Sequence, residues 1–403
     1  MAQVNVSAGG GGLGLLSRFN NGNAPLLYIA AEEAEEDFDQ TTIQLWKEEG
    51  FLVEYLPYLG TEKEFAADLH QISAKKGLGD YFAVLAFGDA AAVCLEVFRK
   101  NTPKLCALVA YYPTSIPDPH STFPISTRVV VHLAGSEVGV TRNPQVLGIQ
   151  GKRRTITKRI NGAIGVGGRL QLAYPSYTYA NAGPGFAEHD LPEYDKVSER
   201  LAWTRSLDAM RKGFRLEVEL EKVWEEHLDY EFKHKDAAKT IATMVSNPYV
   251  NHIPTLTGGI GREDLFKFYE EFFIPSNPPS LSTRLVSRTV GVDKVVDEMI
   301  ISFKHTCEVD WMLPGVPPTD KDVEVALVSV VKLRGGKLCH EHIYWDQASV
   351  LVQVGLLDPK MVPQKFKDRG LERLPVSGKE AALKVVDEDS IPSNLLILDW
   401  DGE

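Results

Sequence analysis

The chain runs Val84-Leu85-Ala86-Phe87-Gly88-Asp89-Ala90-Ala91-Ala92 within its first half. This run has the form of a nucleophile elbow, in which a strand ends, small residues allow a strained turn and a helix begins. The turn requires small side chains two positions before and two positions after the nucleophile. Ala86 and Ala90 meet this requirement when Gly88 occupies the nucleophile position. We therefore expect an elbow without a nucleophile. The alternative, a nucleophilic Asp89, would place Phe87 at a site that needs a small residue.

Strand-like and helical segments alternate on both sides of the elbow. This alternation predicts βαβ units and a largely parallel sheet, and thus an α/β domain. The expected strands are residues 26–30, 51–58, 81–87, 105–111 and 128–133, and the expected helices are residues 42–50, 63–75, 90–100 and 193–212.

After Gly213 the order changes, with helices first and β-rich segments afterwards, which predicts an α+β domain with a curled antiparallel sheet. The expected helices are 216–232, 236–245 and 262–273, and the β-rich segments are 295–311, 323–334 and 337–346. We expect a flexible arm at 1–24, the α/β domain at 25–214, the α+β domain at 215–362 and a charged tail at 363–403. One apolar run of the tail, 395–398, is a candidate to dock back onto the body.

Composition excludes several classes of partner. The 403 residues exceed one ordinary core, so two domains are expected. A net charge of -12 argues against nucleic acid, and we interpret the basic run at 152–159 as a solvated loop. No apolar run reaches the roughly 20 residues of a membrane helix, and no secretory signal is visible. The four widely spaced cysteines indicate reduced thiols in a cytoplasmic protein: Cys94, Cys106, Cys307 and Cys339.

Residues 25–213 resemble the dienelactone hydrolase family of the α/β-hydrolase fold. The resemblance rests on the elbow, on the run from His132 to Glu137, and on the run from Tyr179 to Phe186. It implies a catalytic cysteine at Gly88, an acid near Glu137 and a histidine at Pro184. Neither glycine nor proline can do that chemistry, so two of the three triad members are absent. A rearranged loop could bring His189 into the place of the missing histidine, and we interpret Cys94 as a core thiol.

The richest polar run in the second half is Leu338-Cys339-His340-Glu341-His342-Ile343-Tyr344-Trp345-Asp346-Gln347. If the run is a strand, its alternation places four polar side chains on one face, namely His340, His342, Tyr344 and Asp346. Such a face suits solvent or a pocket lining. Cys339, Ile343 and Trp345 supply the other, more apolar face.

Two further histidines are candidates for the same pocket. In the strand-like run 299–307, His305 shares a face with Met299, Ile301, Phe303 and Cys307, so it is either a satisfied core histidine or a pocket residue. His252 lies in the Pro-flanked run 247–255, which we interpret as a bend between two helices.

Residues 216–360 resemble the SnoaL-type polyketide cyclases of the nuclear-transport-factor-like superfamily. The matching stretches are 249–255, 261–263, 304–306, 317–321, 341–346 and 353–357. The resemblance implies a cone of curved sheet closed by helices. It also implies an acid/base aspartate at Asp346 and pocket histidines at His252 and His305. Asp320 departs from the glycine that the family has in the turn at 317–321.

The resemblance predicts a small-molecule cyclase, lyase or isomerase of polyketide-like secondary metabolism, with no cofactor and a homo-oligomeric (dimeric) state. Asp346 would act as the base, and His342, His305 or Tyr344 would stabilise the oxyanion. The further pocket-lining candidates are His340, Trp311, Tyr249 and Phe303. Three alternatives stay open: a dienelactone-hydrolase-type hydrolase, a non-catalytic small-molecule-binding protein, and a metal site at His340 and His342, which the spacing does not favour. The glycine clusters at 9–12 and 162–168 lack the context of a dinucleotide motif.

Overall fold

The structure is a computed structural model. It describes residues 24–77, 79–135, 137–142, 145–146, 149–150, 154–159, 168–169, 172–398 and 400. The chain divides between Val218 and Glu219 into two compact units, and the predicted boundary near 214 lies just before this point. The predicted arm and the two glycine clusters fall outside the described residues, except for Ala24 and Gly168.

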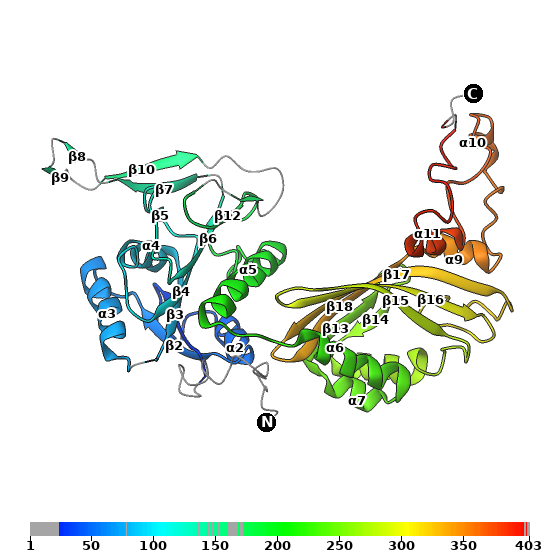
Figure 1. Cartoon of the computed structure of the whole chain (residues 1–403), viewed down its shortest axis with the longest axis horizontal. Coiled ribbons are helices and arrows are strands. Elements are labelled where there is room, and N and C mark those ends of the chain that lie inside the picture. Colours follow the sequence, from blue (N-terminus) through cyan, green and yellow to red (C-terminus); the bar gives the residue numbers. More distant parts are fainter. Residues whose placement is uncertain are drawn as a thin grey trace. The chain divides into compact units, whose positions relative to one another are not determined.

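The first unit contains a seven-stranded sheet (Figure 1). Its strands, in spatial order, are β11 (Gly168–Arg169), β12 (Ser176–Tyr179), β6 (Arg128–Ala134), β4 (Leu105–Tyr111), β3 (Phe82–Phe87), β1 (Leu26–Ala31) and β2 (Leu52–Pro57). All neighbours are parallel except β11 and β12. Every residue of β3 and β4 is buried, as expected for central strands of a parallel sheet covered on both faces. The predicted parallel sheet is thus confirmed.

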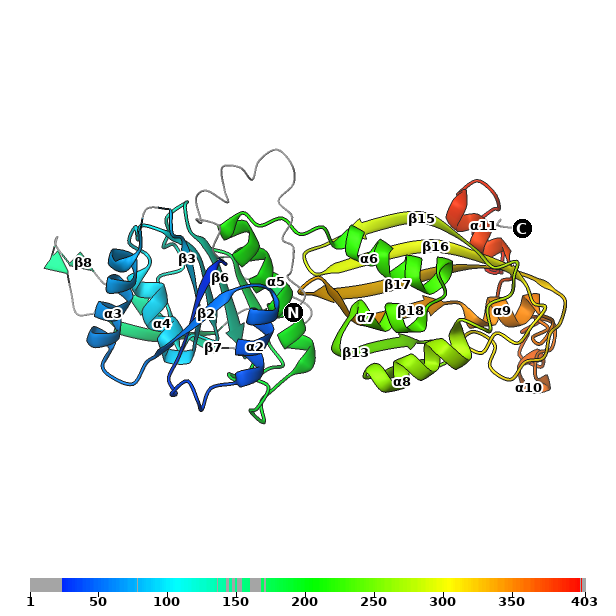
Figure 2. The same cartoon turned by 90° about the horizontal axis from the view of Figure 1, so that it is seen from below.

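Helices cover both faces of this sheet, as Figure 2 shows. The pair α3 (Glu62–Lys75) and α4 (Gly88–Val97) lies on one face, and α2 (Gln40–Glu48) and α5 (Lys196–Phe214) lie on the other. Trp46 of α2 and Trp203 of α5 pack with ring centroids 4.6 Å apart. Two small sheets complete the unit: β10 (Arg154–Arg159), β7 (Glu137–Arg142) and β5 (Ser115–Ile116) form one, and β8 (Gln145–Val146) and β9 (Ile149–Gln150) form the other.

The second unit contains a six-stranded curved sheet, with its larger group of helices on one face (Figure 1). Its strands, in spatial order, are β14 (Thr257–Ile260), β13 (Met244–His252), β18 (Lys337–Trp345), β17 (Asp322–Arg334), β16 (Lys294–Lys304) and β15 (Ser282–Val290). Neighbours are antiparallel except β13 and β18. The bend predicted at 247–255 is wrong, because most of it belongs to β13. The register of β13 shifts between Met244 and Tyr249, where Pro248 has no N–H to donate.

The inner face of this sheet is covered by α6 (Leu220–Leu228), η1 (Asp229–Lys233), α7 (Ala237–Ala242), α8 (Arg262–Lys267) and η2 (Phe268–Phe273). The segments η1 and η2 are π-helical turns that continue α6 and α8. In η1 the His234 N–H donates to the Asp229 carbonyl at 2.8 Å, and in η2 the Ile274 N–H donates to the Tyr269 carbonyl at 3.1 Å. Both bonds span five residues instead of four.

The C-terminal residues return to the opposite, outer face of the sheet. There α9 (Gln347–Gln353) and α11 (Glu380–Val386) contact β17, with the short α10 (Gln364–Lys367) between them in the chain. Ala382 of α11 is buried, whereas residues 395–398 are exposed, so the apolar run predicted to dock does not do so. Within the described part of the chain, no helix combines the length and apolar character needed to cross a membrane.

Candidate active site

A small cavity lies between the inner face of the second unit's sheet and its helical cover. Its volume is about 50 Å³, enough for one or two water molecules. Aromatic and aliphatic side chains form most of the lining, which includes no Lys or Arg among the described residues. The polar or titratable residues of the lining are Glu231, Glu341, Tyr269, His252 and Ser329.

Two glutamates face this cavity from opposite sides. Glu341 comes from β18 and is 5% exposed, and Glu231 comes from η1 and is 6% exposed. Burial raises the pKa of Glu341 to about 8, and the charge of Asp297 adds to this effect. Burial, followed by the charge of Glu341, raises the pKa of Glu231 well above its ordinary value. Glu341 is therefore the first of the two to ionise as the pH rises, and Glu231 is the one that keeps its proton.

The helical cover holds Glu231 from two sides. The hydroxyl of Tyr269, in η2, faces the Glu231 carboxyl, and its interaction with that carboxyl opposes part of the rise in the pKa of Glu231. His227 of α6 places Nε2 3.9 Å from Glu231 Oε2, but burial lowers the pKa of His227 to about 3, so this histidine is neutral. Glu231 and Tyr269 both lie in π-helical turns. Such turns are rare and frequently occur at functional sites, because the extra residue redirects a side chain.

Two of the cavity residues have unused hydrogen-bonding capacity. The hydroxyl of Ser329 is buried and has no hydrogen-bond partner in the part of the chain that the structure describes. His252 Nδ1 lies 3.3 Å from the Thr257 carbonyl, which can only accept, so we assign the proton to Nδ1 and a lone pair to Nε2. Burial lowers the pKa of His252 to about 4, which makes it a neutral imidazole packed against Trp311 and Phe273. An unpartnered buried hydroxyl calls for a water or ligand.

The polar face of β18 predicted to line a pocket points away from this cavity, so that prediction is wrong. His340 and His342 are half-buried on the outer face, and Tyr344 is 41% exposed. They form a ring cluster with Tyr249, whose centroid lies 4.6 Å from that of His340 and 5.4 Å from that of His342. The reason is that the other face of the strand carries the apolar side chains Ile343 and Trp345. Burial of these side chains decides the register of β18 and places Glu341, which shares their face, on the inner side of the sheet.

The two other predicted groups also lie outside the cavity. Asp346 is exposed and caps α9, where its Oδ1 accepts a bond from the Ala348 N–H at 3.0 Å. His305 is fully buried, and its Nδ1 lies 3.0 Å from Thr319 Oγ1, within the turn that contains Asp320. Asp320, which stands where the cyclase family has glycine, has a φ of 55° in this turn. This is the backbone region that favours glycine.

Of the predicted pocket residues, only His252 and Trp311 line the cavity. Phe303 contributes to a separate, more polar hollow of about 290 Å³, whose other lining residues include Lys304, Asp322, Glu324 and Lys379. Neither Glu341 nor Glu231 is predicted as a site residue from the sequence, although the sequence contains a signal for both. Glu341 alternates with Ile343 and Trp345, and Glu231 falls on the stripe of Leu220, Trp224 and Leu228 at helical spacing. A lone acid on an apolar face is that signal.

The first unit contains the predicted elbow. Gly88 begins α4 with a φ of 50°, so the strained residue of the turn stands where we placed it. The carboxylate of Glu32, which follows β1, accepts a hydrogen bond from the Asp89 N–H at the start of α4. A Cβ at Gly88 would collide with this carboxylate. The place of a nucleophile side chain is thus filled by Glu32.

His189 does lie at this carboxyl end of the sheet. Its Nδ1 lies 2.7 Å from Oδ2 of the buried Asp39, and the same oxygen accepts the His189 N–H at 3.0 Å and the Thr42 hydroxyl at 2.6 Å. Burial opposes ionisation of Asp39, but these bonds outweigh it and lower its pKa to about 2. The pKa of His189 is raised because the bonds and charge of Asp39 outweigh burial. This pair has the orientation of a histidine–aspartate base.

The residues that stand at the acid and histidine positions of a hydrolase triad, Glu137 and Pro184, do not join the His189–Asp39 pair. Glu137 is exposed at the start of β7, and Pro184 is exposed in a turn. Glu188, beside His189, is buried and accepts a hydrogen bond from Tyr112; burial raises its pKa to about 7. Cys94 is fully buried in the core, and Asp89 accepts a bond from Thr114. In the described residues, no cluster of three or more His, Cys, Asp or Glu has the arrangement of a metal site.

Comparison with known proteins gives weak likenesses only. No family model matches the chain, and no curated protein matches it significantly. Among solved structures, TsrD from Streptomyces laurentii is 20% identical with a TM-score of 0.28, over 34% of this chain and 96% of that one. AclR from Streptomyces galilaeus is 19% identical with a TM-score of 0.29, over 38% of this chain and 93% of that one. A protein named as a SnoaL-like polyketide cyclase, from Jannaschia sp. CCS1, is 20% identical with a TM-score of 0.28, over 35% of this chain and 98% of that one. These scores are too low to assign a fold or a function, which rest on the geometry above.

Proposed function

We propose that the second unit is an acid/base enzyme, an isomerase, lyase or cyclase, that removes a proton beside the carbonyl of a small polyketide-like substrate. The observation that carries this proposal is the pair of buried glutamates in one apolar cavity whose described lining has no Lys or Arg. Buried carboxyl groups exchange protons near neutral pH, where ordinary glutamates are fully ionised. The two glutamates also have different surroundings, which separates an acid from a base.

Glu341 is the base in this proposal. Its carboxylate takes the proton from the carbon, the C–H electron pair forms a C=C bond, and the carbonyl oxygen becomes an enolate. Glu231 retains its proton because burial and the charge of Glu341 raise its pKa, although the hydrogen bond with Tyr269 lowers it in part, and Glu231 donates this proton to that oxygen. Return of the proton to another carbon gives isomerisation. Attack of the enolate on a second carbonyl gives ring closure, and loss of a β-hydroxyl with that proton gives dehydration.

The cavity limits the substrate. An anionic group would meet two acids and the nearby charge of Asp297, so the reacting part of the substrate is uncharged. A volume of about 50 Å³ is well below that of usual ligand pockets, so the substrate has to displace side chains of η1 and η2.

Hydrogen–deuterium exchange tests the proton-transfer step without knowledge of the natural product. Cyclohexenone, an uncharged ring ketone, is incubated with the protein in D₂O, and its α-protons are followed by NMR. We expect exchange with the wild type, at least about a hundredfold less with Glu341→Gln, and no change with Asp346→Asn or His342→Gln, which alter residues outside the cavity. Equal exchange in wild type and Glu341→Gln would refute the proposal. Saturable ketone binding without exchange would instead favour a binding protein.

A second candidate is hydrolysis in the first unit, which the His189–Asp39 pair favours. In this alternative His189 Nε2 removes a proton from water, whose oxygen attacks the ester carbonyl directly because Gly88 supplies no nucleophile. The acyl C–O bond then breaks, and the protonated His189 returns the proton to the leaving alkoxide. The test is hydrolysis of p-nitrophenyl acetate by the wild type, His189→Gln and His120→Gln. A loss confined to His189→Gln supports this candidate, and equal rates of the three proteins refute it.

A further inference from the structure

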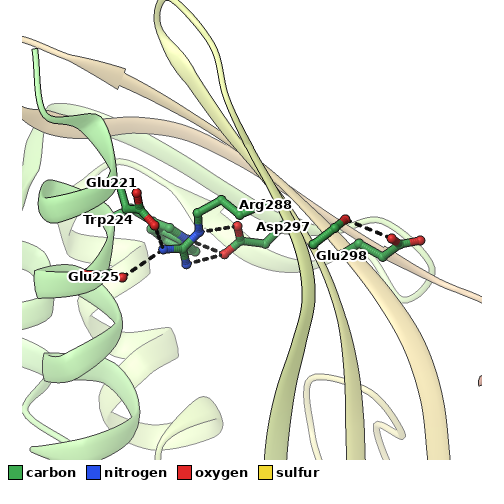
Figure 3. Close-up of polar contacts among 7 residues, drawn as sticks. Glu221, Trp224, Glu225, Arg288, Asp297 and Glu298 are labelled. Atoms are coloured by element: carbon green, nitrogen blue, oxygen red, sulfur yellow. Dashed lines mark hydrogen bonds and ion pairs between the residues drawn. The ribbon is translucent and has the colours of Figure 1, made fainter. Parts of the chain in front are cut away.

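A buried ion pair lies behind the cavity, between α6 and the strands β15 and β16 (Figure 3). Arg288 and Asp297 are direct cross-strand partners. The guanidinium donates from Nε to Asp297 Oδ1 at 2.7 Å and from Nη2 to Oδ2 at 2.8 Å. Its Nη1 reaches Glu221 at 2.9 Å and Glu225 at 3.0 Å on α6. Asp297 is 1% exposed, so this two-point contact is what keeps its charge in the interior.

Asp297 is connected to Glu231 through α6. The Trp224 indole Nε1 donates to Asp297 Oδ2 at 2.8 Å (Figure 3). Trp224 also lines the cavity. Its ring stacks on His227 at 5.4 Å with an interplanar angle of 15°. His227 in turn contacts Glu231. A carboxylate fixed at the sheet therefore fixes the rotation of the helix that carries one of the two glutamates.

Asp297 is connected to Glu341 across the sheet. Asp297 pairs with Ser329 on β17, and Ser329 pairs with Ile343 on β18, two residues from Glu341 on the same face. Its charge therefore acts on Glu341 through the cavity wall, where little water screens it. The other charged or titratable groups that face Glu341 are Glu231 of η1, Tyr269 of η2, His252 of β13 and His227 of α6.

Those other groups carry no charge at neutral pH. Burial raises the pKa values of Glu231 and Tyr269 and lowers those of His252 and His227, so each is held in its neutral form. Asp297 is the group that the Arg288 guanidinium contacts at two points and whose charge acts on Glu341. We propose that Asp297, fixed by Arg288, is the positioning residue of this site, which orients Trp224 and places a permanent negative charge behind Glu341 to strengthen it as a base. This inference rests on the proposed function of the glutamate pair.

Infrared titration of the full-length protein tests this role. Protonated carboxyl groups have a C=O stretch separate from that of carboxylates, and the band lost in Glu341→Gln is that of Glu341. We expect this band to disappear with a midpoint near pH 8 in the wild type. In Asp297→Asn, which keeps an oxygen for the Trp224 indole, the midpoint falls by about one pH unit or more. The matched control is Glu298→Gln, which removes the same charge from the next residue, on the outer face.

A merely structural role of Asp297 would lower stability without moving this midpoint. An unchanged midpoint in folded Asp297→Asn would therefore overturn the inference. The double variant Arg288→Met/Asp297→Asn leaves no unpaired charge, and it gives the same expected shift if the single variant does not fold. Deuterium exchange separates the two claims. Exchange that requires Glu341 together with an unmoved midpoint refutes this inference and leaves the proposed function. Exchange indifferent to Glu341 together with a moved midpoint refutes the proposed function, and with it the role of Glu341 as a base, but leaves the coupling between Asp297 and Glu341.

Discussion

Replacing Glu341 by glutamine should make the second unit more stable at neutral pH. The pKa of Glu341 is raised from 4.5 to about 8, so the folded protein holds a proton that the unfolded chain releases. The stabilisation from this proton is complete below pH 4.5 and is lost as the pH rises through about 8. Between about pH 5 and about pH 7, two pH units at 1.36 kcal/mol each cost the wild type about 3 kcal/mol. Glutamine has the same shape and no proton to lose, so Glu341→Gln avoids this cost.

The assay is urea unfolding at about pH 5 and about pH 7, followed by tryptophan fluorescence. Trp224 and Trp311 line the cavity and report on the second unit, whose transition need not coincide with that of the first. The wild type should lose about 3 kcal/mol more between the two pH values than Glu341→Gln. Glu298→Gln, which changes a residue on the outer face, should behave as the wild type does. An identical pH dependence in wild type and Glu341→Gln would show that Glu341 is ionised at both pH values, and would refute the reasoning.

Three further predictions concern single contacts. Tyr269→Phe removes the hydroxyl that faces Glu231 and should slow deuterium exchange about tenfold or more in the NMR assay, whereas Tyr344→Phe, on the outer face, should not. Asp39→Asn should cost the first unit about 2 kcal/mol in urea unfolding, because Asp39 caps α2 and holds His189. Its pKa of about 2 makes this contribution present above pH 3.8 and lost as the pH falls through about 2, so a difference that persists in stronger acid would contradict it. Gly88→Ala should lower the free energy of unfolding of the first unit by about 2 kcal/mol or more, because the strain of a left-handed φ and the collision with Glu32 add. Gly50→Ala also has a left-handed φ but meets open space, so it should lower this free energy by about 1 kcal/mol. Equal losses would show that Glu32 moves aside.

Local pattern was enough to predict five parallel strands of the first unit, β1, β2, β3, β4 and β6, and the position of its elbow, but not β11 and β12. Its central strands are continuous apolar runs, and the small residues around Gly88 fix the turn. The second unit was harder for physical reasons. β15 is an exposed edge strand without apolar alternation, and β13 contains a proline, so neither has the usual signal of a strand.

The site itself depended on a choice between the two faces of one strand. The sequence predicts the alternation of β18 correctly. It favours the face with four polar groups as the pocket face, whereas the face that lines the cavity carries the single acid Glu341. The partner of Glu341 comes from a π-helical turn more than a hundred residues earlier. Short-range periodicity has no access to that pairing, because it depends on tertiary packing of the helical cover.

The two π-helical turns make this domain sensitive to chain length as well as to residue type. Removing Asp229 or Tyr230, the two residues of η1 that precede Glu231, would restore ordinary helical winding and rotate Glu231 by about 100° relative to the helix before it. The acid would then leave the cavity although no cavity side chain had been substituted. Homologous chains that keep both glutamates but lack that one residue should have lost this chemistry, and a gap at η1 would identify them from sequence alone.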